Sequence, residues 1–151
     1  MLPLKIRLIG SVIQKGSFSR PKYMKKKILL VDDIKEFRTL VKIILSGNYD
    51  VVTAEDGEEA LSMIEGGLLP DVIVTDLMMP RVDGYQLISK IMSGESSLRI
   101  PVIVLSNVDR ATDREKLKEQ GIAGYIIKPF NTSELKEGLG RSLITALSDN
   151  N

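Results

Sequence analysis

The stretch Ile28-Leu29-Leu30-Val31-Asp32-Asp33 is an apolar run of strand length that ends in two carboxylates. Two other runs end in a similar way: Val72-Ile73-Val74-Thr75 is followed by Asp76, and Tyr125-Ile126-Ile127 is followed by Lys128 and Pro129. Neighbouring parallel strands share one carboxyl edge, where open α/β sheets form their sites. We therefore expect the three acids and the lysine to converge. Clustered carboxylates repel one another unless a divalent cation lies among them, and oxygen ligands favour magnesium or a similar ion.

Strand-like and helical patterns alternate along the chain from Lys26 onward. Runs such as Val102-Ile-Val-Leu105 are apolar on both faces, so helices must cover both faces of the sheet. The sequence therefore predicts an α/β fold with a doubly wound, five-stranded parallel sheet and right-handed crossovers. The expected strands are 28–31, 49–54, 72–75, 101–105 and 124–127; the expected helices are 34–45, 56–65, one lined by Leu87, Ile88, Ile91 and Met92, 109–120, and 131–147.

Polar residues stand where the predicted helices begin. Asp33 is placed to cap the first helix, and Asp56 and Asn131 each lie three residues before a glutamate, which is the spacing of a capping box. We interpret Gly84 as a turn residue and Gly121 as a helix stop.

Composition removes several classes of chemistry. The 151 residues include no cysteine and no histidine, which excludes disulfides, thiolate metal sites and imidazole bases within this chain. The net charge of +1 is unevenly spread: residues 1–27 carry eight Lys or Arg and no acid, and the remainder carries 13 basic against 20 acidic residues. The body of the protein is therefore acidic and its leader basic.

The leader, residues 1–23, does not continue the alternating pattern. Lys5 and Arg7 interrupt its apolar stretch, so it lacks a signal-peptide core and is too polar to span a membrane. We expect a cytoplasmic protein with a basic, non-catalytic extension over 1–23, a natural start at Met24, and one domain over 24–151. Only Ser148-Asp-Asn-Asn follows the last predicted helix, so we expect no attached DNA-binding domain.

Four motifs, taken in order, resemble the receiver domain of two-component response regulators, in particular the single-domain chemotaxis regulators. They are Ile28 to Asp33, Asp76-Leu-Met-Met-Pro-Arg-Val-Asp-Gly84, Ser106, and Tyr125-Ile-Ile-Lys-Pro-Phe130. The resemblance implies a flavodoxin-like strand order, 2-1-3-4-5, with helices on both faces. It also implies a signalling phosphoacceptor of a two-component system or phosphorelay, not an enzyme beyond self-catalysed phosphorylation and dephosphorylation.

The same resemblance implies the roles of the site residues. Asp76 would accept a phosphoryl group from a histidine kinase or a histidine phosphotransfer protein. Asp33 and Asp76, with the backbone carbonyl of Met78, would bind Mg²⁺, or Mn²⁺ as a substitute, while Asp32 would hold a coordinated water. Lys128 would pair with Asp76 at rest and with a phosphoryl oxygen afterwards.

Ser106 and Tyr125 would form the switch by this resemblance. The hydroxyl would engage the new phosphoryl oxygens, the ring would turn inward, and a protein target would bind the face formed by 109–120, 124–127 and 131–147. The resemblance also implies a cis peptide at Lys128-Pro129. A homodimer through the last two helices is possible; direct nucleic-acid binding and membrane insertion are not expected.

Three positions affect how this chain would behave as a receiver. Asn107 follows Ser106, where the family usually has a small residue. Met78 and Val108 occupy the positions that resemble the family's pair of residues that tunes the rate of phosphoryl hydrolysis. Both side chains of that pair are apolar and cannot position an attacking water, so we expect a slowly hydrolysed phosphoryl group.

Other readings remain open at this point. Taken singly, Asp32 and Asp33 could cap a helix, Asp76 could lie in a turn, and Lys128 could be a solvated surface lysine. An aspartate-nucleophile phosphatase or dehalogenase would have a second Asp two residues after the nucleophile, where this chain has Met78. A pseudo-receiver scaffold is disfavoured by the intact acids, and flavin binding by the lack of a phosphate loop after the first strand.

Overall fold

The structure is a computed structural model that describes residues 24–93 and 99–148. The expectation for the leader, residues 1–23, therefore lies outside the described residues. Within them, five parallel strands form one sheet in the order β2-β1-β3-β4-β5, which confirms the expected topology. The strands are β1 (Lys26–Val31), β2 (Tyr49–Ala54), β3 (Val72–Thr75), β4 (Val102–Ser106) and β5 (Gly124–Ile127).

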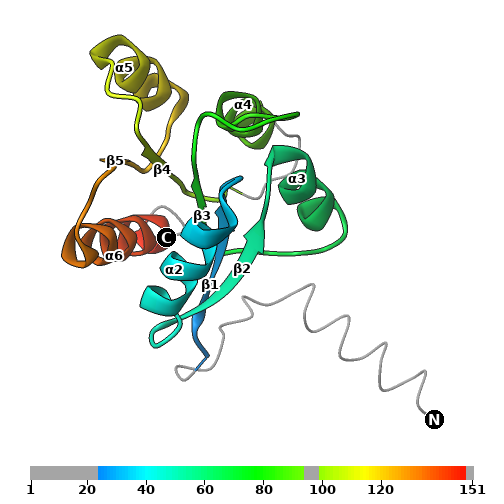
Figure 1. Cartoon of the computed structure of the whole chain (residues 1–151), viewed down its shortest axis with the longest axis vertical. Helices are drawn as coiled ribbons and strands as arrows, with labels where there is room; N and C mark the ends of the chain where they lie inside the picture. The colour runs from blue at the N-terminus through cyan, green and yellow to red at the C-terminus, as the bar shows by residue number, and fades with distance from the viewer. Residues whose placement is uncertain (1–23, 94–98, 149–151) are drawn as a thin grey trace.

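Helices cover both faces of this sheet (Figure 1). They are α2 (Lys35–Leu45), α3 (Gly57–Glu65), α4 (Gly84–Ser93), α5 (Ala111–Gln120) and α6 (Thr132–Ser148). One buried cluster joins the sheet to α2 and α6, and the other joins it to α3, α4 and α5. Successive residues of β1 alternate between the clusters, because side chains along a strand point to opposite faces.

The register of the strands sets the position of the functional edge. Val31 pairs with both Ala54 and Thr75, so β1, β2 and β3 end level with one another. Ser106 pairs with Ile127 at the end of β4 and β5. The residues that follow each strand therefore leave the sheet along one edge.

Two of the predicted caps are present and one is not. Asp56 Oδ1 accepts a hydrogen bond from Glu59 N at 2.8 Å, and Asn131 Oδ1 accepts one from Glu134 N, also at 2.8 Å. The predicted cap at Asp33 is wrong: α2 begins after Ile34, which has no capping side chain. Asp33 lies one residue too early to reach the free N–H groups of the first turn.

The structure confirms the prediction for Gly121 but differs from the one for Gly84. Gly121 ends α5 in the left-handed conformation with φ 99°, as predicted. Gly84 is not a turn residue but the first residue of α4, where a Cβ would overlap the carbonyl oxygen of Asp76. Met92, one of the apolar residues that define this predicted helix, is 36% exposed near the end of α4, because the Leu87 and Ile88 side of that helix faces the sheet.

Most boundaries agree with the sequence pattern to within two residues. The fourth strand is shifted by one residue and α5 begins at Ala111 instead of Asp109, which is the usual uncertainty of helix and strand ends. Among residues 24–93 and 99–148, none of the helices is both long and apolar enough to cross a membrane.

Replacing Gly84 with alanine should destabilise the protein by about 1–3 kcal/mol, because the added methyl group meets the backbone of Asp76 and Leu77. Gly140 is the matched control: it lies within α6, and apart from its neighbours and its own helical backbone, no described atom would lie within 4 Å of a Cβ there. Gly140→Ala should stabilise the protein by about 0.5–1 kcal/mol. Urea unfolding followed by circular dichroism measures both; equal effects would contradict the steric explanation.

Candidate functional site

Asp32 and Asp76 occupy equivalent places at the ends of two neighbouring strands. Asp32 directly follows β1 and Asp76 directly follows β3, and Asp76 N donates a hydrogen bond to the carbonyl of Val31 at 3.0 Å. The two residues are 1% and 8% exposed respectively. Both carboxylates are therefore built into the sheet edge, unlike the exposed Asp33 beside them.

Each buried carboxylate has one oxygen held by the backbone. Ile34 N donates to Asp32 Oδ1 at 2.8 Å, and Leu77 N donates to Asp76 Oδ1 at 2.7 Å. The other oxygen of each faces the same ammonium group: Lys128 Nζ lies 2.9 Å from Asp32 Oδ2 and 3.3 Å from Asp76 Oδ2. One cation thus bridges two carboxylates whose orientations are already fixed.

Lys128 is also held in place by its own backbone and by an aromatic ring. Its backbone N–H donates to the carbonyl of Ser106 at 2.9 Å, which continues the β4–β5 ladder by one residue. Its Nζ lies 4.0 Å from the ring centroid of Phe37 on α2, and Phe37 packs edge to face against Phe130 at 6.1 Å. The Lys128–Pro129 peptide bond is cis, as the resemblance implied.

The site carries more negative than positive charge. Burial raises the pKa of Asp32, while the hydrogen bonds from Lys128 and Ile34 lower it, and the net pKa lies above its ordinary value. Three carboxylate oxygens, one each from Asp32, Asp33 and Asp76, lie within 4.8 Å of one another. A single lysine does not neutralise three carboxylates, and a compact set of hard oxygen donors suits a divalent cation.

The two expected switch residues meet at Val108. Val108 N donates to Ser106 Oγ at 3.2 Å, and the phenol of Tyr125 donates to the carbonyl oxygen of Val108. Ser106 is buried and Tyr125 is partly buried. The main chain of one residue therefore connects both hydroxyl groups, a role that an apolar side chain in the sequence gave no reason to expect.

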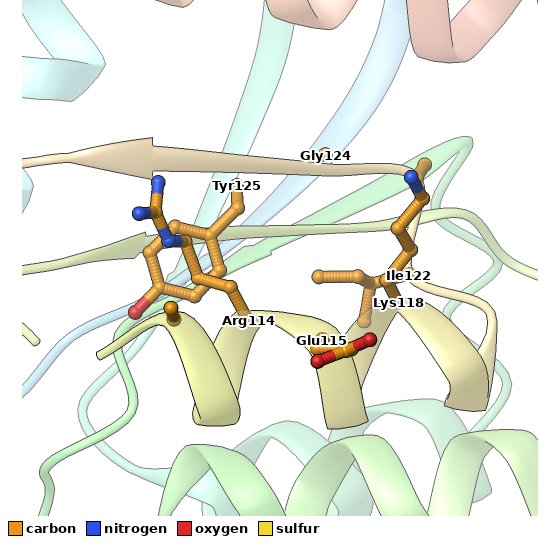
Figure 2. Close-up of a pocket in the computed structure, with 8 residues that line it drawn as sticks. Arg114, Glu115, Lys118, Ile122, Gly124 and Tyr125 are labelled. Carbon is orange, nitrogen blue, oxygen red and sulfur yellow. The ribbon is translucent and has the colours of Figure 1, made fainter. Parts of the chain in front are cut away.

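A groove lies beside Tyr125, between α5 and β5 (Figure 2). Its volume is about 550 Å³. The Arg114 guanidinium lies 6.0 Å from the centroid of the Tyr125 ring and 3.0 Å from Asp109 Oδ1. The groove is lined by Ala111, Arg114, Glu115, Lys118, Ile122, Ala123, Gly124 and Tyr125, so it belongs to a different surface from the acidic cluster.

The remaining predicted residues are exposed. Met78, two residues after Asp76, is 64% exposed, and Asn107 is exposed as well. Sequence reasoning assigned no role at the site to Phe37 or to Arg38, whose guanidinium donates to the carbonyl of Asp32 at 2.6 Å. Helical spacing places both on α2 but does not reveal that they contact the site.

Comparison with known proteins identifies the family. The profile of the response regulator receiver domain matches residues 28–139. The chain belongs to the response regulator receiver domain family. Receiver domains are the signalling phosphoacceptors of two-component systems and not conventional enzymes.

Related proteins include both short and long regulators. The chain is 38% identical over 110 residues to protein PilG of Pseudomonas aeruginosa, covering 72% of this chain and 81% of PilG. It is 39% identical over 130 residues to the transcriptional regulatory protein PhoP of Bacillus subtilis, covering 83% of this chain and 53% of PhoP. The chain spans about half the length of the transcriptional regulators that it matches.

Solved structures share the fold. Chemotaxis protein CheY4 of Vibrio cholerae superposes with a TM-score of 0.71 at 30% identity, covering 78% of this chain and 98% of CheY4. The receiver domain of a Pseudomonas aeruginosa sensor histidine kinase superposes with a TM-score of 0.70 at 32% identity, covering 79% of this chain and 98% of that domain. That second structure holds a magnesium ion in its active site cleft.

Burial, together with the nearby Tyr85 and Asp113, raises the pKa of Tyr125 from its ordinary value of 10.0 to about 12. Between these values the unfolded chain binds fewer protons than the folded protein, so stability should fall as the pH rises from about 10 to about 12. Tyr125→Phe should make that fall shallower and remove the component with a pKa of about 12 from a phenolate absorbance titration. An unchanged titration would contradict this environment for Tyr125.

Proposed function

We propose that this receiver accepts a phosphoryl group on Asp76 from a histidine kinase or a histidine phosphotransfer protein, and that phosphorylation changes a protein-binding face. The observation that carries the proposal is the Asp76 carboxylate, which is buried, fixed at Oδ1 by Leu77 N–H, and paired at Oδ2 with Lys128 Nζ. A nucleophilic carboxylate needs this combination of fixed orientation and a neighbouring positive charge.

The donor set fits a divalent cation. Asp33 and Asp76 would hold Mg²⁺, or Mn²⁺ in its place, with the backbone carbonyl of Met78, and Asp32 would contribute through a coordinated water. The mutual closeness of the three carboxylates supports this assignment, as does the magnesium ion in the related kinase receiver domain. When bound, the cation would neutralise charge on the incoming phosphoryl group and help to align it.

The residues of the chain supply the rest of the chemistry. A carboxylate oxygen of Asp76 forms the new O–P bond as the N–P bond to the partner's histidine breaks, and the imidazole leaves with the bonding electrons. Lys128 exchanges its contact with Asp76 for one with a phosphoryl oxygen, because its flexible stem lets the ammonium follow the charge. Charge neutralisation and alignment are the main requirements of phosphoryl transfer.

The conformational change that follows phosphorylation would be transmitted through the main chain of Val108. Engagement of Ser106 Oγ by the phosphoryl group would remove an acceptor from Val108 N, and Tyr125 donates to the carbonyl of the same residue. We infer that the ring of Tyr125 turns inward and that a protein target binds the face formed by α5, β5 and α6. A homodimer through α5 and α6 would use the same surface.

We infer a cytoplasmic receiver domain over residues 24–151, with a non-catalytic basic extension over 1–23 and no direct contact with nucleic acid or insertion into membranes. Phosphorylation from small donors and dephosphorylation would be catalysed by the domain itself.

Incubation with acetyl phosphate and Mg²⁺ should add one phosphoryl group per chain, measured by intact mass. Asp76→Asn should abolish the addition, because an amide is not a nucleophile here. Asp109→Asn, which alters an exposed carboxylate in a different loop, is the control and should be labelled normally. Removing Mg²⁺ with EDTA should also prevent labelling.

Two outcomes would contradict this function. An unmodified wild-type protein would remove the phosphoacceptor assignment, and equal labelling of Asp76→Asn would move it to another residue. Steady release of product from p-nitrophenyl phosphate would instead favour an aspartate-nucleophile phosphatase.

The phosphorylated protein should lose its phosphoryl group slowly. Met78 and Val108 are apolar and cannot orient a water molecule for attack, so Met78→Asn should accelerate hydrolysis severalfold by adding a polar group near Asp76. Loss of the phosphoryl mass with time measures the rate, and Leu69→Asn, which changes an exposed apolar residue that precedes β3, is the control. A wild-type half-life of seconds would contradict the prediction.

A further inference from the structure

Arg81 lies in an unusual place in the loop between β3 and α4. Its φ is +61°, a left-handed conformation that side-chain-bearing residues other than Asn and Asp adopt rarely and at a cost of about 1–2 kcal/mol. The loop that contains it begins beside Asp76 and includes Met78, the source of the backbone carbonyl in the proposed cation site. Contacts elsewhere must offset the unfavourable backbone conformation.

Those contacts are made with the segment that joins β2 to α3. The guanidinium forms hydrogen bonds with Asp56 and with Glu55, the latter at 2.9 Å, and lies 3.7 Å from Glu58. The Asp56 side chain is 1% exposed, while those of Glu55 and Glu58 are 56% and 63% exposed. Ion pairs between two exposed side chains contribute little to stability. Of the three pairs, the one with buried Asp56 therefore contributes most to holding Arg81 in place.

Asp56 is a suitable anchor because it is itself fixed. Burial acts to raise the pKa of Asp56, but hydrogen bonds from Glu59 N and Arg81 outweigh that effect and hold the pKa below its usual range. The carboxylate therefore remains charged at neutral pH and caps α3 while it binds the arginine.

A second contact holds the same loop at the next residue. Gly57 N donates to the carbonyl oxygen of Val82 at 2.9 Å, and a Cβ on Gly57 would lie 2.6 Å from that oxygen. The loop thus lies directly on the first turn of α3, at a distance that only glycine permits.

This anchor is continuous with the acidic cluster. Ala54, the last residue of β2, accepts a hydrogen bond from Asp32 N at 3.2 Å and directly precedes the acids that bind Arg81. At the far end of the loop, Gly84 N donates to the carbonyl of Leu77 at 2.9 Å. Hydrogen bonds therefore link the end of β1 to the end of β2, and link the two ends of the loop that contains Met78 after β3.

We propose that Arg81 is a positioning residue: its ion pair with buried Asp56 fixes the loop from Leu77 to Asp83 and thereby sets the affinity of the acidic cluster for Mg²⁺. This inference rests on the proposed function, because it assumes that Met78 contributes its carbonyl to the cation site. Arg81 acts through the loop and does not itself contact the cluster.

Isothermal titration of the full chain with Mg²⁺ tests the proposal. Arg81→Gly removes the side chain at a position where glycine adopts the left-handed backbone without strain. Because glycine also makes the loop more flexible, Asp56→Asn, which weakens the same pair and leaves the backbone of residue 81 unchanged, accompanies it. We expect Arg81→Gly to raise the Mg²⁺ dissociation constant roughly tenfold, the scale of effects seen when groups that orient metal ligands are removed. Arg81→Lys, which keeps the charge but lacks the planar fork, should fall between the wild type and Arg81→Gly.

Two comparisons separate positioning from general destabilisation. Arg114→Gln removes another exposed arginine that pairs with an acid and should bind Mg²⁺ like the wild type. In a double-mutant cycle, Asp56→Asn combined with Arg81→Gly should weaken binding little more than either change alone, because both break one interaction. Circular dichroism at the titration temperature verifies that each variant is folded, and Asp56→Asn tests the pair if Arg81→Gly is not.

The outcomes are distinguishable. Wild-type affinity in folded Arg81→Gly, or additive effects in the cycle, would overturn the role of Arg81 and leave the phosphoacceptor proposal intact. A wild-type protein that binds no Mg²⁺ would overturn both.

Discussion

The Lys128 ammonium lies between Asp32 and Asp76 and links the ends of β1, β3 and β5 at the site. Two carboxylates that are almost completely buried cannot remain charged beside each other without a cation, and Lys128 Nζ lies within 3.3 Å of an oxygen of each. Burial raises the pKa of Asp32 and the hydrogen bond from Lys128 lowers it, so the lysine offsets part of the cost of burying this carboxylate. Three carboxylates beside one lysine leave an excess of negative charge, and such a set of oxygen donors suits a divalent cation.

The scaffold makes this arrangement possible because its apolar strands are covered by helices on both faces. Buried β1 and β3 hold the acids, and β5 carries the lysine across β4 to meet them. The carboxylates of Asp32 and Asp76 follow the ends of β1 and β3, where backbone N–H groups orient them. Rigid strands and short connections thus hold the carboxylates and the lysine in a fixed geometry.

The strands, their order of pairing and the convergence of the acids could be predicted because they depend on periodicity and on the known behaviour of parallel sheets. The failures concern contacts between residues distant in sequence. Gly84 was interpreted locally as a turn, although its backbone is constrained by Asp76. Neither the contact of Phe37 with Lys128 nor that of Arg81 with Asp56 leaves a signal in spacing or composition, because both depend on how separate elements pack.

The peptide groups on either side of the Val108 α-carbon bear on how a signal could leave the site. Val108 N–H is shared with Ser106 and its carbonyl with Tyr125, so neither hydroxyl can be reoriented without disturbing the residue that holds the other. The positions of the Ser106 and Tyr125 hydroxyl groups are therefore coupled. Under the proposed switch, the connection between the two hydroxyl groups would run through the main chain of Val108, whose side chain takes no part in either hydrogen bond.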